Sequence, residues 1–276
     1  MYGVTQIRET DSYKHLGIVQ SRNGKHPYDI DAVTRTIRGT FLSLAGTVSG
    51  RAGPNPGTAM KLYYRSVLPH SVFGCELWND ISKSDIHQLE IAHHFCLKRA
   101  QGLPHLTRSD MVTGLVGAAS LEACIDLQKL SFFGQLCRTQ ANKLSRQLML
   151  CRLYQFKLCT SQKLGFIPDL ARILEKYALL PFLWSPTEPT FPSKYAWKRM
   201  CKTAVHKHEE LAWTERMNTS AYFNMYKQVH PYLRESSIWS VARVRPECLS
   251  LLKLLAYLCY QRPPEQLTEC HACSKS

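Results

Sequence analysis

The sequence lacks any apolar run long enough to cross a membrane, and it lacks an N-terminal signal peptide. Its first twenty residues contain no apolar segment of the kind that a signal peptide requires. The longest apolar run, Cys248 to Tyr260, covers about 13 residues and includes Lys253, whereas a bilayer needs about 20. We therefore expect a nuclear or cytoplasmic protein without a membrane partner.

Motifs for catalysis are also missing. The sequence contains no phosphate-binding glycine loop, no HExxH zinc motif and no nucleophile elbow. Polymerases hold Mg²⁺ between adjacent carboxylates, but here Ile30 separates Asp29 from Asp31, and the chain has no Asp-Asp pair. We expect one of these two aspartates to cap a helix instead. The sequence thus predicts no Mg²⁺ site and no catalysis by this chain alone.

The 11 cysteines do not form the dense, regular pattern of a secreted disulfide protein. Their odd number and wide scatter indicate a reducing compartment, where most of them are core residues. Cys270 and Cys273 are spaced to share one Zn²⁺, but they supply only half of a zinc site, which would need Cys248 or Cys259 as a further ligand. Zn²⁺ is therefore the one metal for which the sequence has a candidate.

Acidic residues are scarce relative to basic ones. The 276 residues include 35 Lys and Arg against 21 Asp and Glu, a formal net charge of +14, which makes a polyanion the default partner. From Leu127 to Pro168 the chain contains no acid at all. We expect the cations of this stretch to contact phosphates, namely Lys129, Arg138, Lys143, Arg146, Arg152 and Lys157.

Hydrophobic periodicity predicts a mostly α-helical fold. At the N-terminus, Val4 to Ile7 and Tyr13 to Gln20 have strand spacing and are predicted to pair as one β-hairpin. The strongest helix is expected to begin at Ser82 and end at Gly102, with His93 in its buried stripe. Further helices are predicted over 29–48, 58–68 (ending at Pro69), 118–139, 142–158, 220–228 and 247–260.

A proline-rich segment, residues 181–193, is predicted to be a linker. The helix after it has an apolar face that includes Trp197 and His208. The opposite face carries basic side chains, among them Lys198, Arg199 and Lys202. Between Phe191 and Arg245 the cations are interleaved with aromatic residues, and exposed rings beside cations suit RNA or single strands. These aromatic residues are Tyr195, Trp197, Trp213, Tyr222, Phe223, Tyr226, Tyr232 and Trp239. The expected units are a β-hairpin at 1–27, a helical domain at 28–180 and a basic, aromatic helical segment at 194–276.

Several short motifs, in this order and spacing, resemble the reverse transcriptases of non-LTR (LINE-like) retrotransposons. They are Tyr13 to Ile18 (YKHLGI), Phe73 to Trp78 (FGCELW), Ile86 to Glu90 (IHQLE), Gly102 to Pro104 (GLP), Leu130 to Gly134 (LSFFG) and the pair Cys270 with Cys273. The resemblance covers roughly 120 residues, Tyr13 to about Leu136, and beyond them only the C-terminal cysteines.

The resemblance implies the last palm strands, the thumb and a downstream connector of such a polymerase. The catalytic aspartates of the family would precede Met1, so the resemblance implies a truncated, catalytically silent fragment. A thumb grips the backbone of an RNA, DNA or hybrid duplex, which requires cations and no base-reading code. The competing hypothesis is a stand-alone basic helical scaffold that docks acidic partners. Oligomeric state and autonomous folding stay open.

Overall fold

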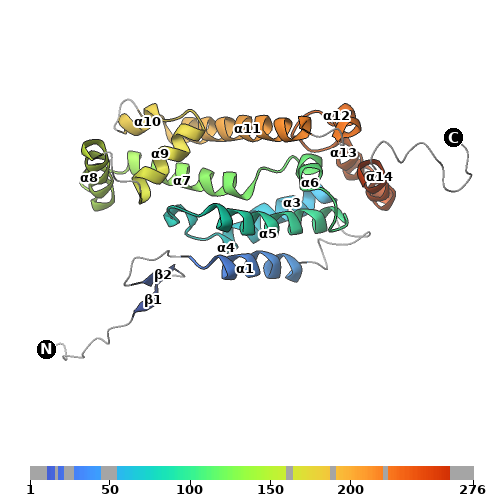
Figure 1. The fold of residues 1–276 in the computed structure, drawn as a ribbon, viewed down its shortest axis with the longest axis horizontal. Helices are drawn as coiled ribbons and strands as arrows, with labels where there is room; N and C mark the ends of the chain where they lie inside the picture. Colours follow the sequence, from blue (N-terminus) through green and yellow to red (C-terminus); the bar gives the residue numbers. More distant parts are fainter. Residues whose placement is uncertain are drawn as a thin grey trace, which may run out of the picture.

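A computed structural model describes residues 11–15, 18–21, 28–44, 55–159, 164–186, 191–219 and 223–261, and these are mostly helical (Figure 1). No helix within those ranges is long and apolar enough to cross a membrane. The first elements are β1 Ser12–His15, β2 Ile18–Ser21, α1 Ile30–Ser43, α3 Pro56–Leu62, a π-helical segment η1 Tyr63–Val67, α4 Leu68–Ser71, a 3₁₀ turn η2 Cys75–Leu77 and α5 Lys83–Gln101. They are followed by α6 Ser109–Val116, α7 Leu121–Arg138, α8 Leu144–Leu158, α9 Phe166–Lys176, α10 Pro181–Trp184, α11 Lys194–Asn218, α12 Asn224–Val229, α13 Ser237–Val244, a 3₁₀ turn η4 Pro246–Cys248 and α14 Leu249–Gln261.

The mostly helical fold class is confirmed, but the predicted pairing of the N-terminal strands is not. Residues 13–20 are not one strand, because β1 and β2 divide them and pair with each other in antiparallel register, His15 opposite Ile18. Only two residues separate these strands, and the second is Gly17, a spacing typical of tight hairpins. The other predicted strand, Val4 to Ile7, lies outside the described residues.

Side-chain caps set several helix starts, as the sequence predicts. Asp29 caps α1 by accepting a hydrogen bond from the Ala32 amide at 3.1 Å. Ser82 caps α5 by accepting one from the Asp85 amide at 3.1 Å. Gly102 ends α5 in the left-handed conformation (φ 68°), which favours glycine. These local signals are independent of the rest of the chain, so they are readable from sequence.

Pro69 does not end its helix, contrary to the prediction. The chain passes from α3 through the π-helical segment η1 into α4, and the Leu68 amide donates to the Tyr63 carbonyl. Proline has no amide hydrogen, but here it lies in the first turn of α4, where that hydrogen is not needed. Tyr63 and Val67 are buried, so core packing holds the backbone helical on both sides of the proline.

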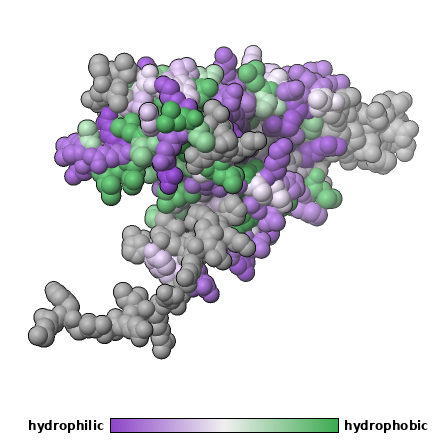
Figure 2. Space-filling view, turned by 60° about the vertical axis from the view of Figure 1, so that its left-hand side comes forward, coloured by the Kyte–Doolittle hydropathy of each residue, from purple (hydrophilic) through white to green (hydrophobic). Residues whose placement is uncertain are grey.

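The α9 cluster is one of two groups of buried side chains. It joins the second half of α7, α8, α9, α10 and the first half of α11, with Phe133, Leu153, Ile173 and Leu183 among its members. Helix α8 lies at one end of the molecule (Figure 1). Figure 2 brings this end forward and shows hydrophobic surface exposed among hydrophilic side chains. The α9 cluster therefore leaves part of its apolar surface uncovered by the described residues.

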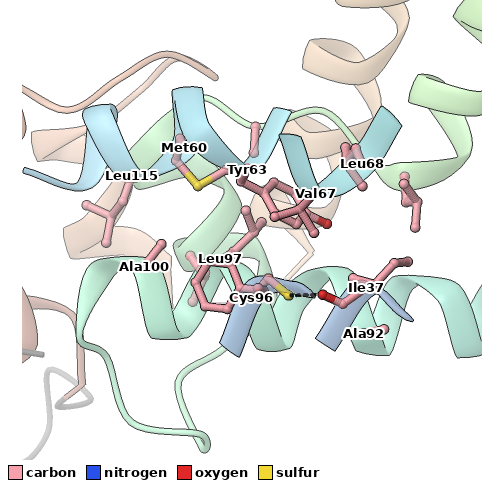
Figure 3. Close-up of a cluster of buried hydrophobic side chains, with 14 of the residues drawn as sticks. Ile37, Met60, Tyr63, Val67, Leu68, Ala92, Cys96, Leu97, Ala100 and Leu115 are labelled. Atoms are coloured by element: carbon pink, nitrogen blue, oxygen red, sulfur yellow. Dashed lines mark hydrogen bonds between the residues drawn. The ribbon is translucent and has the colours of Figure 1, made fainter. Parts of the chain in front are cut away.

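The α5 cluster is the larger group. It joins α1, α3 to α6 and the start of α7 to the second half of α11 and the helices that follow it. Figure 3 shows its centre, where Tyr63 and Val67 from η1 face Leu97 and Cys96 of α5. The Cys96 thiol lies 4.0 Å from the Ile37 carbonyl oxygen of α1. Buried cysteines here act as small apolar side chains, as the sequence predicts.

Helices α7 and α11 contribute buried side chains to both clusters. α1 packs on α5, α5 on α7 and α7 on α11, so these four form successive layers (Figure 1). α11 places Trp197 and Val205 in the α9 cluster and Trp213 and Met217 in the α5 cluster. The predicted linker, residues 181–193, does not divide the hydrophobic core, because its Leu183 and Phe191 are buried in the α9 cluster.

α7 and α11 pack against each other at Gly134. The Trp197 indole N–H donates to the Leu130 carbonyl at 2.8 Å, and its ring lies against Gly134. A Cβ at position 134 would come within 2.3 Å of the Trp197 ring. Only glycine lets the two helices meet at this distance.

We predict that Gly134→Ala destabilises the protein, because the added methyl group pushes Trp197 away from the Leu130 carbonyl. The expected loss is about 1–3 kcal/mol in the free energy of unfolding, measured by urea denaturation. The matched control is Gly39→Ala in the middle of α1, where a Cβ meets nothing within 4 Å. That variant gains about 0.5–1 kcal/mol from helix propensity. Equal effects of the two substitutions would contradict this packing.

Candidate nucleic-acid interface

Helix α11 presents a basic face to solvent along its first half. Trp197, Cys201 and Val205 recur every four residues and are buried, so they hold one side of the helix against the protein. The positions between them carry cations, and no acid occurs from 194 to 208. Four exposed cations in the first half of the helix, Lys194, Lys198, Arg199 and Lys202, form what we call the α11 basic face, and Lys207 is exposed farther along the helix.

None of these four cations forms an ion pair with a carboxylate in the part of the chain that the structure describes. Lys194 and Lys202 are two turns apart, which is about 12 Å along the axis. Tyr195 lies on the same face and is 84% exposed. A row of unpaired cations beside an exposed ring can neutralise phosphates and stack on a base.

A groove runs beside this face between α7 and α11, with a volume of about 310 Å³. Lys198 and Lys202 line one wall, and Gln128 and Gln135 of α7 line the other. Ammonium and amide groups are donors for phosphate and sugar oxygens. Among the described residues that line this groove, Glu76 is the one carboxylate. The groove therefore extends the α11 basic face toward α7 with neutral donors.

The structure places the predicted cations of α8 on a separate surface. Lys143, Arg152 and Lys157 are exposed at the end of the molecule that α8 forms. Arg152 donates to the Gln155 side-chain oxygen at 3.2 Å. Arg146 is half-buried, and its guanidinium donates to the Thr139 carbonyl. The exposed cations of α8 are available to a ligand, whereas Arg146 has a structural role.

Arg138 of α7 contacts the segment that directly precedes α11. It is half-buried, donates to the Pro192 carbonyl at 3.4 Å and places its guanidinium 5.8 Å from the centre of the Phe191 ring. Arg138 is therefore held at the start of α11 and does not belong to the cations of α8.

Lys129 is the predicted phosphate contact that the structure contradicts. It is buried, and its ammonium group lies 2.6 Å from the Asp169 carboxylate, which Arg172 also contacts at 3.0 Å. The acid-free stretch ends at Pro168, one residue before the carboxylate that neutralises Lys129. Charge runs in sequence do not show which distant acid lies opposite a lysine in the fold.

Most aromatic residues of the C-terminal half are core residues rather than stacking surfaces. Trp197, Trp213 and Trp239 are almost completely buried, and so are Phe223 and Tyr226. Of the residues predicted as stacking rings, Tyr195 and Tyr232 are exposed in the described segments. The predicted pairing of cations with rings therefore applies to Tyr195 on α11 and does not apply to the tryptophans.

His93 is a hydrogen-bonded core residue, as the sequence predicts. Its Nε2 lies 3.2 Å from the Ala119 carbonyl oxygen, which only accepts, so Nε2 carries the hydrogen. Its Nδ1 therefore accepts from the Tyr63 hydroxyl at 2.8 Å. Burial lowers the pKa of His93 to about 3, so the ring is neutral at physiological pH. Neither nitrogen is free for a metal.

The N-terminus of α7 carries a cluster of carboxylates that sequence reasoning missed. Glu90 of α5 accepts from the Glu122 amide at 3.0 Å, and Glu209 of α11 accepts from the Ser120 amide at 2.8 Å. Carboxylates stabilise helix N-termini by charge and by hydrogen bonding. Burial raises the pKa of Glu90 to about 7. The contacts join residues 32 and 89 positions apart, so no local signal reveals them.

The other side of this cluster is neutralised by α9. Lys176 contacts Glu122 at 2.7 Å and Asp126 at 3.0 Å. The Tyr177 hydroxyl donates to Asp126 at 2.8 Å. The acids of α7 are therefore paired, and the cluster ties α5, α7, α9 and α11 together.

The candidate zinc ligands Cys270 and Cys273 lie outside the described residues. Within the described ranges, no group of three or more His, Cys, Asp and Glu side chains is placed to hold a metal. Cys75, Cys96, Cys137 and Cys201 are buried free thiols, and burial raises the pKa of each to about 12. Such thiols are poor nucleophiles and poor ligands at neutral pH.

Comparisons with known proteins give no further assignment. No family model matches the chain, and neither does any curated protein or any solved structure. The site is therefore defined by its own geometry.

We predict that Lys129→Met destabilises the protein without affecting nucleic-acid binding. Methionine keeps the apolar stem but leaves Asp169 without its buried partner, which costs about 3 kcal/mol in the free energy of unfolding. The matched control, Lys157→Met on exposed α8, changes stability by less than about 0.5 kcal/mol. Urea denaturation measures both. A Lys129→Met protein of normal stability would show that the pair is not structural.

We also predict that Glu90→Gln gains stability over the natural protein as pH rises. Below about pH 4.5 Glu90 is protonated in both the folded and the unfolded protein. Above about pH 7 it is ionised in both states, and the folded protein then bears the cost of burying the charge. Glutamine keeps the acceptor for the Glu122 amide and has no charge. The difference in unfolding free energy should grow by about 2 kcal/mol between pH 5 and 8. A difference that does not change with pH would contradict this assignment.

Proposed function

We propose that the protein binds nucleic acid nonspecifically, through the sugar–phosphate backbone, on the α11 basic face. The observation that carries the proposal is the row of exposed cations Lys194, Lys198, Arg199 and Lys202, which form no ion pair within the described residues, on a helix segment without acids. Buried tryptophans fix the opposite side of this helix, so the cations are held in place on a rigid element. The proposed activity is binding alone.

The chemistry of the α11 basic face favours backbone contacts over sequence reading. Lysines and arginines neutralise phosphates in any sequence, while base recognition needs donors and acceptors matched to base edges. Tyr195 and the neutral amides of α7 add a stacking ring and sugar or phosphate donors. RNA, DNA and RNA–DNA hybrid all present this backbone. The resemblance to non-LTR reverse transcriptases is a hypothesis that agrees with this chemistry and rests on the short motifs alone.

We predict that the triple variant Lys198→Gln, Arg199→Gln, Lys202→Gln binds nucleic acid more weakly and with less salt dependence. Each lost phosphate contact on a duplex lowers the slope of log K against log salt by about 0.9, so the slope falls by about 2–3. The slope is measured by fluorescence anisotropy with a short RNA–DNA hybrid, at salt concentrations from low to high.

The matched control removes the same charge from α8, with Lys143→Gln, Arg152→Gln and Lys157→Gln. This control keeps the α11 basic face and should retain most of the slope. An equal decrease of the salt slope in both variants would show that net charge alone attracts the duplex. Absence of binding by the natural protein at low salt would exclude the proposed function.

A further inference from the structure

Helix α8 leaves an apolar stripe in solvent. The described packing buries only Met149 and Leu153 of this helix. Leu144, Leu148 and Leu158 are 68%, 55% and 68% exposed. Monomeric proteins expose single leucines often, but a row of them on one helix marks an interaction surface.

The spacing of the stripe is that of a helix–helix seam. Leu144, Leu148, Cys151, Gln155 and Leu158 follow one another at steps of four, three, four and three residues. At 100° per residue these positions fall within an arc of about 80°, and they extend for about 21 Å. Alternating steps of three and four place side chains along the line where a second helix packs.

An apolar groove adjoins the stripe. It has a volume of about 540 Å³ and lies between α7, α8 and the start of α9. Leu148 belongs to both the stripe and the groove, whose lining also includes Phe132, Leu136 and Phe166. Large side chains of a helix packed on α8 can therefore enter a pocket beside the seam, as anchors of tight interfaces do.

The charges beside the stripe identify the kind of partner. α8 contains no acid. Arg152 borders the stripe and lines the groove, and the exposed Lys143 directly precedes Leu144, whereas Lys157 lies about 140° around the helix from the centre of the stripe, in a separate hollow beside Leu153. A second copy of α8 would bring the same cations to the seam and supply no carboxylate. A helix with acids flanking its apolar stripe pairs with these cations.

We propose that the α8 stripe docks an amphipathic helix of a partner protein, with glutamates or aspartates on both sides of its apolar face. This surface is separate from the α11 basic face, so the same molecule can hold nucleic acid and a protein partner. Apolar contacts supply the affinity, and the cations of α8 select the charge of the partner.

The test uses the full chain and a labelled peptide. The peptide has 21 residues, with leucine at positions a and d of each heptad and glutamate at e and g. The glutamates keep it from associating with itself. The control peptide has lysine at e and g. We expect the glutamate peptide to bind, with an affinity at least tenfold higher than that of the lysine peptide, by fluorescence anisotropy.

The protein variants distinguish binding at the stripe from nonspecific hydrophobic binding. Leu148→Asn with Leu158→Asn should weaken binding of the glutamate peptide at least tenfold. The matched control, Leu211→Asn with Val244→Asn, changes residues that are 62% and 80% exposed on other helices and should leave binding unchanged. The α11 triple variant should also bind the peptide normally, which separates this proposal from the proposed function.

Three results would overturn the proposal. They are no binding of the glutamate peptide at its highest soluble concentration, equal binding of the two peptides, and an unchanged affinity in Leu148→Asn with Leu158→Asn. A fourth result that would overturn the proposal can come from light scattering. A dimer of the natural protein that this double variant dissociates would show that a second copy occupies the stripe.

Discussion

The contact between Trp197 and Gly134 is the constraint on which the rest of the structure depends. It brings α11 against α7, the two helices that belong to both hydrophobic clusters, and it is secured by the hydrogen bond from the indole to the Leu130 carbonyl. Without it the α9 cluster would lose one wall. At the N-terminus of α7, the Glu209 carboxylate of α11 accepts from the Ser120 amide and fixes the same two helices at a second point, while Glu90 joins α5 to α7 there. Packing at one point and charge at the other therefore define how α11 lies on the protein.

The position of α11 explains why its cations face solvent. A helix that buries Trp197, Cys201 and Val205 on one side leaves other positions exposed to solvent, and in this sequence most of the exposed ones along its first half are basic. Nothing about the α11 basic face needs a special loop or a strained backbone. Helix α8 also exposes the side that it does not bury. That side carries leucines as well as cations, because α8 buries little of its apolar surface. One molecule thus offers two surfaces with different chemistry.

Sequence reasoning succeeded where the signal is local and failed where the partner is distant. The caps at Asp29 and Ser82, the stop at Gly102 and the buried face of Trp197 depend on neighbouring residues, and all are confirmed. The prediction that Lys129 contacts phosphate is wrong because Asp169, 40 positions away, neutralises this lysine. Pro69 was read as a helix end because its position in a helical first turn depends on the buried η1 segment. Of the candidate site, the basic face was predictable, and its separation from α8 was not.

The central claim is that α7 and α11 join both clusters into one cooperative unit. The most direct measurement is amide hydrogen exchange by mass spectrometry at increasing urea concentration, followed on peptides from α5 and from α9. We expect the buried amides of both helices to lose protection at the same urea concentration, because neither cluster retains a complete core once α11 leaves α7. Loss of protection in α9 at clearly lower urea, with α5 still protected, would contradict the claim and would show two independent domains.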